Sequence, residues 1–161
     1  MLIVSDTSPI INLARIGHLH LLPALFSEVV LPPAVFHEIV VQGAGDYGAD
    51  EIAAADWVKV IPVADRLFLE RLSQLLDPGE SEAIALAIEL HADYVLMDES
   101  DGRALAQQYH LKPLGILGIL LRAKTKGLIP TVRLLMDRLR AEANFFIDKD
   151  LYQFILSSAA E

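Results

Sequence analysis

Short apolar runs and amphipathic segments alternate along the whole chain. The apolar runs are rich in β-branched residues and have the length of buried strands. They predict strands at Leu2 to Val4, Val29 to Leu31, Trp57 to Val63 and Asp93 to Met97. Lys112 to Leu114 is a short extended segment, and Phe145 to Ile147 is predicted to form a last strand.

Helices are predicted between these strands by the spacing of apolar residues and by start signals. Ser8 is placed as a cap, with Pro9 at the first helical position. Asp77 to Glu80 resembles a capping box. Further helices are expected at 19–26, from 32 onward, and at 51–55, 66–76, 80–90, 102–109, 115–126 and 131–143, with one more at the end. This alternation predicts an α/β fold with a central, mostly parallel sheet flanked by helices.

Length and composition narrow the class of protein. The 161 residues form most simply one domain, spanning 1–161, with a hydrophobic core. Although 53% of the residues are hydrophobic, the longest apolar stretch, Pro113 to Leu121, is too short to span a membrane. No basic residue precedes the first apolar run, so we expect no secretory signal and a cytoplasmic location. The lack of cysteine excludes disulfides and thiolate chemistry.

The net charge of −9 counts against a nucleic-acid partner, because such proteins are usually basic. Two observations weaken that objection. Clustered carboxylates at a metal site add negative charge that bound cations offset. Basic residues are also concentrated between Arg122 and Arg140, although a solvated helix face is the commoner reason for such a run.

Four carboxylates border or interrupt apolar runs: Asp6, Glu38, Glu82 and Asp98. Charged side chains seldom border buried segments without compensation. Asp6 and Asp98 each follow a predicted strand, and in a parallel sheet such positions meet at one edge. Several carboxylates at one place require a cation, and oxygen-only ligation suits Mg²⁺ or Mn²⁺. The pattern therefore indicates metal-assisted hydrolysis of a phosphodiester.

Each of these residues also has a simpler interpretation. Asp6 fits a turn residue, and Glu38 fits a solvated helix face. Ser8 is explained by its capping position, Asp98 by a cap on the next helix, and Asp101 by the dipole of that helix. Glu80 and Glu82 lie about 200° apart on a helix, so both cannot easily face one metal. Since a capping box explains Glu80, we favour Glu82 as the ligand.

Several segments resemble those of PIN domains. They are Val4 to Ile11, Phe36 to Ile39, Glu82 to Ala87 and Val95 to Asp98. Asp6 to Pro9, Gly79 to Ala83, Asp98 to Arg103 and Gly115 to Ile129 are similar to a PIN-like subgroup common in bacteria and archaea. The resemblance spans nearly the whole chain, and the order and spacing of the motifs carry it more than any one of them.

The resemblance implies a PIN fold and a divalent-metal-dependent ribonuclease. Many relatives are toxins of VapBC-type toxin–antitoxin pairs, so it also implies RNA as substrate, a small antitoxin as partner and a homodimer. Carried over to this sequence, Asp6 and Asp98 would be direct ligands of Mg²⁺ or Mn²⁺, and Glu38 and Glu82 would complete the shell. Further candidates are Thr7 and Ser8 for orienting a ligand or binding phosphate, Asp101 as an extra acid, and Arg103 as a phosphate contact.

The sequence departs from the commoner toxins at two positions. Glu82 stands where Asp is usual, and Met97 stands where Thr often ends the strand. Because Glu reaches one methylene further than Asp, the metal would be shifted or held more weakly.

Two rival functions remain. Gly43 to Gly48 satisfies the dinucleotide-binding pattern, with Asp65 downstream, but the segment before it is predicted to be helical. The other rival is a PIN-like module without catalysis, in which the apolar stretch from Leu114 to Leu121 contacts a partner. A buried helix also explains that stretch.

Overall fold

The fold is built on one parallel sheet. The computed structural model describes residues 1–161 and contains a five-stranded sheet in the order β3-β2-β1-β4-β5. All four neighbouring pairs of strands are parallel. The strands are β1 (Leu2–Ser5), β2 (Glu28–Leu31), β3 (Val58–Val60), β4 (Tyr94–Leu96) and β5 (Pro113–Leu114). The predicted α/β class is therefore confirmed.

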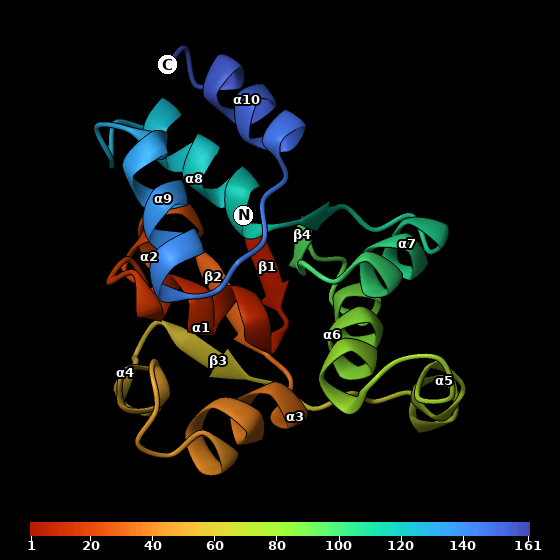
Figure 1. Cartoon of the computed structure of the whole chain (residues 1–161). Helices are drawn as coiled ribbons and strands as arrows, with labels where there is room; N and C mark the ends of the chain where they lie inside the picture. The colour runs from red at the N-terminus through yellow and green to blue at the C-terminus, as the bar shows by residue number, and fades with distance from the viewer.

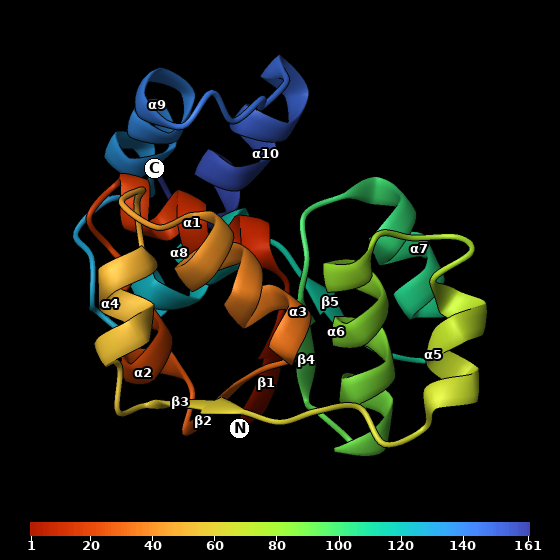
Figure 2. The same cartoon turned by 90° about the horizontal axis from the view of Figure 1, so that it is seen from below.

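Helices cover both faces of the sheet (Figures 1 and 2). One face carries α1 (Thr7–Arg15), α2 (Leu21–Leu25), α8 (Ile116–Thr125), α9 (Val132–Glu142) and α10 (Lys149–Ser158). The other carries α5 (Arg66–Leu72), α6 (Pro78–Glu89) and α7 (Ser100–Gln108). After β2 the chain forms α3 (Pro33–Phe36), the π-helix η1 (His37–Gln42) and α4 (Ala49–Ala54). No helix is both long and apolar enough to cross a membrane.

Alternation along the strands divides the core into two parts. Ile3 and Leu96 belong to a cluster of 30 buried residues on the face of α1 and α8. Val4, Val95 and Met97 belong to a cluster of 13 on the face of α6. Because successive side chains of a strand point to opposite faces, the residues just past β1 and β4 are also directed to different faces. This division decides how the carboxylates of the candidate site are distributed.

Two local predictions are corrected. Helix α1 begins at Thr7, so Asp6 rather than Ser8 occupies the N-cap position, and its side chain makes no capping bond. Residues 145–147 form no strand. There Phe145 is half-buried and Ile147 is buried, whereas Phe146 is exposed. The apolar alternation that suggested a strand comes from a loop pressed onto the core.

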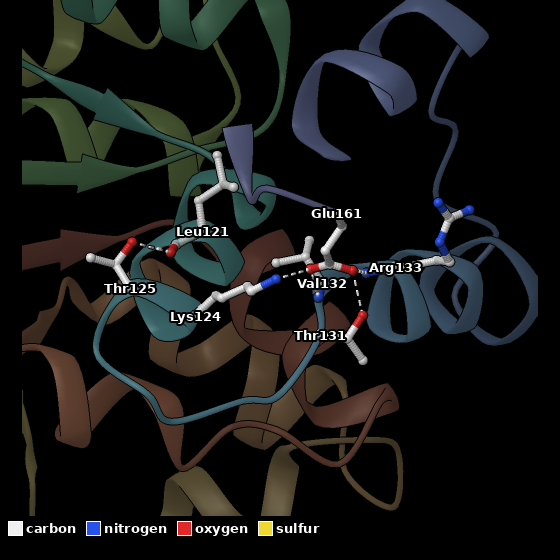
Figure 3. A network of polar contacts seen from close by, with 7 residues as sticks. All are labelled: Leu121, Lys124, Thr125, Thr131, Val132, Arg133 and Glu161. Atoms are coloured by element: carbon white, nitrogen blue, oxygen red, sulfur yellow. Dashed lines mark hydrogen bonds and ion pairs between the residues drawn. The ribbon is translucent and has the colours of Figure 1, made fainter. Parts of the chain in front are cut away.

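The last residue ties three helices together (Figure 3). The carboxylate of Glu161 accepts hydrogen bonds from the backbone N–H groups of Val132 (2.6 Å) and Arg133 (3.1 Å). It also accepts one from the Thr131 hydroxyl and pairs with Lys124 at 2.8 Å. The backbone donors lie at the start of α9, so the Glu161 carboxylate caps that helix. Lys124 lies on α8 and Glu161 follows α10, so the contacts join all three helices.

The dinucleotide pattern lies in the wrong context. Gly43 to Gly48 follows the π-helix η1 instead of a strand, and it precedes an α4 of only six residues. A dinucleotide fingerprint requires a strand before the glycines and a crossover helix after them. The structure contains neither at this place, so the segment is a connecting loop.

Candidate functional site

The site lies where the strand order reverses. From β1 the chain builds outward through β2 to β3 on one side and through β4 to β5 on the other. In open parallel sheets, ligands bind beyond the carboxyl ends of the strands at such a switch point. Asp6 follows β1 and Asp98 follows β4 at that point, and the Asp6 N–H donates to the Leu96 carbonyl at 2.9 Å. The two predicted aspartates therefore share one edge of the sheet.

Asp6 and Glu38 converge above Gly79 in α6. A Cβ atom at Gly79 would lie 2.8 Å from Glu38 Oε1 and 3.1 Å from Asp6 Oδ1. Both oxygens thus border one small space, which exists because residue 79 has no side chain. The hydroxyl of Thr7 donates to Glu38 Oε2 at 2.8 Å and holds that carboxylate in place.

Local helix geometry brings Glu38 to this space. Helix α3 begins with Pro33 at a favourable N-terminal position, and its continuation from His37 is π-helical. A π-turn changes the phase of the side chains that follow and is often found at functional sites. Glu38 lies in the first turn of this π-helix, where it reaches Thr7 and Gly79, while Ile39 packs into the core.

The structure brings Glu80, rather than Glu82, to the side of Asp6. Glu80 is only 9% exposed, and its charge raises the pKa of Asp6 together with the charges of Asp77 and Glu38. Glu82 is half-buried and is not among the charges that act on Asp6. Since the two glutamates lie about 200° apart on α6, the presence of one beside Asp6 directs the other away.

Burial and crowding raise the pKa values of both buried acids. Loss of solvation raises the pKa of Asp6 to about 7, the Thr7 N–H opposes the rise, and Asp77, Glu80 and Glu38 add to it. Loss of solvation and the charge of Asp77 raise the pKa of Glu80 to about 7. A bound cation would offset the electrostatic repulsion between carboxylates that are crowded in this way.

Asp98 faces the other side of the sheet. Its Oδ1 accepts from the N–H of Ile116, the first residue of α8, at 3.0 Å, whereas its buried Oδ2 has no partner. Loss of solvation raises the pKa of Asp98 to about 6, against the effects of the Ile116 N–H and the Arg103 charge. The alternation described above explains why Asp98 lies against α8 while Asp6 lies against α6.

A cleft lined by acidic residues adjoins Glu80. It has a volume of about 300 Å³ and includes the side chains of Asp77, Glu80, Glu99 and Asp101. Asp101 lies in the first turn of α7, as predicted, and Ser8 is half-buried in the first turn of α1. Sequence reasoning missed Gly79, Asp77 and Glu99 as parts of this site. In the sequence, Asp77 stood out only as part of a helix start, and Gly79 only as part of that start and of a motif similar to PIN-like proteins.

Comparison with known families identifies the fold. A family model described as PIN domain matches residues 2–161. The chain belongs to the PIN-domain family. PIN domains are generally nucleases and typically use divalent metals. No curated protein matches the chain.

The oxygen donors of this PIN domain suit a divalent ion held by few protein ligands. No three Asp, Glu or His side chains are grouped closely enough to enclose a metal. Mg²⁺, however, is usually bound through one or two carboxylates, with waters and substrate phosphates completing its shell. Asp6 and Glu38 meet that need above Gly79, and the unpartnered Oδ2 of Asp98 leaves one more acceptor at the switch point.

Proposed function

We propose that this PIN domain is a divalent-metal-dependent endoribonuclease. The observation that supports the proposal best is the convergence of Asp6 Oδ1 and Glu38 Oε1 on the space above Gly79, where the charge of Glu80 also acts on Asp6. A nuclease must bring negative charge onto an already negative phosphodiester, and crowded carboxylates become favourable for that reaction only with a cation among them.

Each residue has a defined part in the proposal. Asp6 and Glu38 would hold Mg²⁺ or Mn²⁺, Glu80 would add negative charge near Asp6, and Thr7 keeps Glu38 oriented. Bound there, the ion would lower the pKa of a water molecule and neutralise charge on the phosphate. Asp98 would act across the switch point through water, and Arg103 would contact a phosphate. Glu82 keeps no direct part in the proposal, because Glu80 and not Glu82 is among the charges that act on Asp6.

The proposal extends to the role of a toxin in a toxin–antitoxin pair, acting in the cytoplasm as a homodimer with a small antitoxin. A reading frame next to the gene that encodes a small, charged, DNA-binding-like protein would support this role. If no such reading frame is present, the toxin role is contradicted and the nuclease proposal stands without an antitoxin.

A non-catalytic PIN module is the second candidate, because no three acidic groups enclose a metal. RNA cleavage separates the two. Purified protein is incubated with mixed RNA in Mn²⁺, Mg²⁺ or EDTA, beside the Asp6→Asn and Glu38→Gln variants and the control Glu70→Gln, an exposed acid on α5.

We expect cleavage with either metal and none in EDTA. Asp6→Asn should lose at least about 100-fold in rate, as removal of a group that stabilises the transition state does. RNA left intact by the wild type, or cut equally by Asp6→Asn, would contradict the proposal.

A further inference from the structure

We propose that the groove between β5, α8 and α10 binds one unpaired nucleotide of the RNA, with its base stacked on Phe146 and its phosphate paired with Arg103. The inference rests on the proposed function. It adds to that function a subsite for one nucleotide.

The groove is a built feature of the fold. It has a volume of about 400 Å³. Its lining consists of apolar side chains, two glycines and two charged residues: Pro113, Leu114, Leu117, Phe145, Phe146, Leu151, Ile155, Gly115, Gly118, Asp98 and Arg103. Asp98, one of its lining residues, follows β4 next to the end of β1, but its side chain lies on the face of α8, opposite to that of Asp6. In the proposal, RNA bound at Asp6 passes the carboxyl ends of β1 and β4 and places a further nucleotide in the groove.

Phe146 has the properties of a stacking platform. It is 84% exposed, more than any other large apolar side chain of the chain. Its neighbours Phe145 and Ile147 are packed into the core, and the Ile147 carbonyl accepts a bond from Arg140 at 2.7 Å. The ring is therefore presented to solvent by a backbone anchored on both sides. Aromatic rings held in this way stack with bases of single-stranded nucleic acids.

Arg103 supplies the positive charge of the groove. It uses Nη1 to donate to the Met97 carbonyl at 2.9 Å, and its charge lowers the pKa of Asp98 without a direct ion pair between the two side chains. The guanidinium group has five N–H donors, so most of them remain free for phosphate oxygens. The position of Arg103, half-buried at the start of α7, limits how far it can move.

Charge favours this groove over the cleft on the other side of the switch point. That cleft is lined by Asp77, Glu80, Glu99 and Asp101 and contains no basic residue, so it repels phosphates. The groove contains one carboxylate and one guanidinium, together with apolar walls that suit a base. We therefore expect RNA bound at the switch point to extend into the groove of Phe146 and not into the acidic cleft.

Binding of a short single-stranded RNA labelled with a fluorophore tests the inference. Fluorescence anisotropy is measured in the Asp6→Asn background, which prevents cleavage, with Mg²⁺ present. Phe146→Ala should weaken binding about tenfold, the effect of losing one stacked base. Phe146→Trp should restore the affinity, and its fluorescence should be quenched by RNA. The control Phe154→Ala, 65% exposed on α10 but outside the groove, should bind as the parent does.

Three results would overturn the inference. Equal affinity in Phe146→Ala and Phe154→Ala, in a protein that cleaves RNA, would remove the subsite and leave the nuclease proposal intact. A change from dimer to monomer in Phe146→Ala, with unchanged RNA binding, would make the groove an interface between two copies. Affinity for duplex RNA equal to that for single strands would show that no base enters the groove. If wild type neither binds nor cuts RNA, the nuclease proposal fails as well.

Discussion

At the scale of single residues, the missing side chain of Gly79 shapes the site. It lets Asp6 and Glu38 approach one point from β1 and η1, two elements far apart in sequence. Asp6, Glu38 and Asp98 stand out in the sequence because each lies beside an apolar run, and the structure brings Asp6 and Glu38 together, whereas their part in a metal site stays a prediction. The choice between Glu80 and Glu82 could not be predicted, since it depends on how α6 is rotated against the sheet. The role of Gly79 could not either, because it is defined by what surrounds it.

The substitution Gly79→Ala separates the site from the stability of the fold. The new Cβ would lie 2.8 Å from Glu38 Oε1 and 3.1 Å from Asp6 Oδ1, so both flexible carboxylates must move. Alanine is favoured over glycine within a helix by up to about 1 kcal/mol, so the free energy of unfolding should stay equal or rise. RNA cleavage should fall at least about tenfold, because a displacement of less than 1 Å is costly at a catalytic site. Unchanged cleavage in a folded Gly79→Ala protein would contradict this arrangement.

At the scale of elements, the strands and most helices were predictable because periodicity reports burial. The runs at 2–4, 29–31 and 93–97 coincide closely with β1, β2 and β4. The prediction failed at residues 145–147, where a loop over the core has the same apolar alternation as a strand. The π-helix η1 was also beyond prediction, because its sequence differs little from that of an α-helix.

The hydrogen bonds between Glu161 and the start of α9 can be tested by substitution. Burial alone would raise the pKa of Glu161, but hydrogen bonds from Lys124, Thr131 and the N–H groups of Val132 and Arg133 lower it to about 2. A lowered pKa stabilises the folded state at pH values above the ordinary pKa of 4.5. This stabilisation is lost as the pH falls toward 2. Glu161→Gln should therefore lower the free energy of unfolding at pH 7 by about 1 kcal/mol, the effect of losing a helix cap.

Chemical unfolding of Glu161→Gln and wild type at several pH values measures this difference. The exposed Glu142→Gln serves as control, since Glu142 pairs only with Arg138 on the surface of α9. A gap between Glu161→Gln and wild type that persists at pH 2 would show that the charge of the carboxylate is unimportant.

At the scale of the whole molecule, the chain combines a net charge of −9 with a fold that gathers acids at one edge. The order of the acidic motifs made the family recognisable from the sequence. The separation of Asp98 from Asp6 was not predictable, because it depends on which face each residue takes after its strand ends. The groove beside Phe146 likewise depends on where α10 packs.

The buried acids make the metal-free protein sensitive to pH. The pKa values of Asp6 and Glu80 are raised to about 7 in the fold, so the folded state binds protons more tightly than the unfolded chain. Stability contributed by these groups is complete below about pH 4 and is lost as the pH rises through 7. In EDTA at pH 8, the free energy of unfolding of Asp6→Asn, measured with denaturant, should therefore exceed that of wild type by on the order of 2 kcal/mol. Below pH 4 the two should be equal, and a constant difference would contradict the assignment.

Manganese binding tests the central claim most directly. Titration of Mn²⁺ into metal-free protein at pH 7.5, followed by calorimetry, should give one site in the wild type. Asp6→Asn and Glu38→Gln should each weaken it at least about tenfold, as loss of a ligand or of its support does, whereas the exposed Asp50→Asn on α4 should bind as wild type does. Equal Mn²⁺ affinity in wild type and Asp6→Asn would contradict the account.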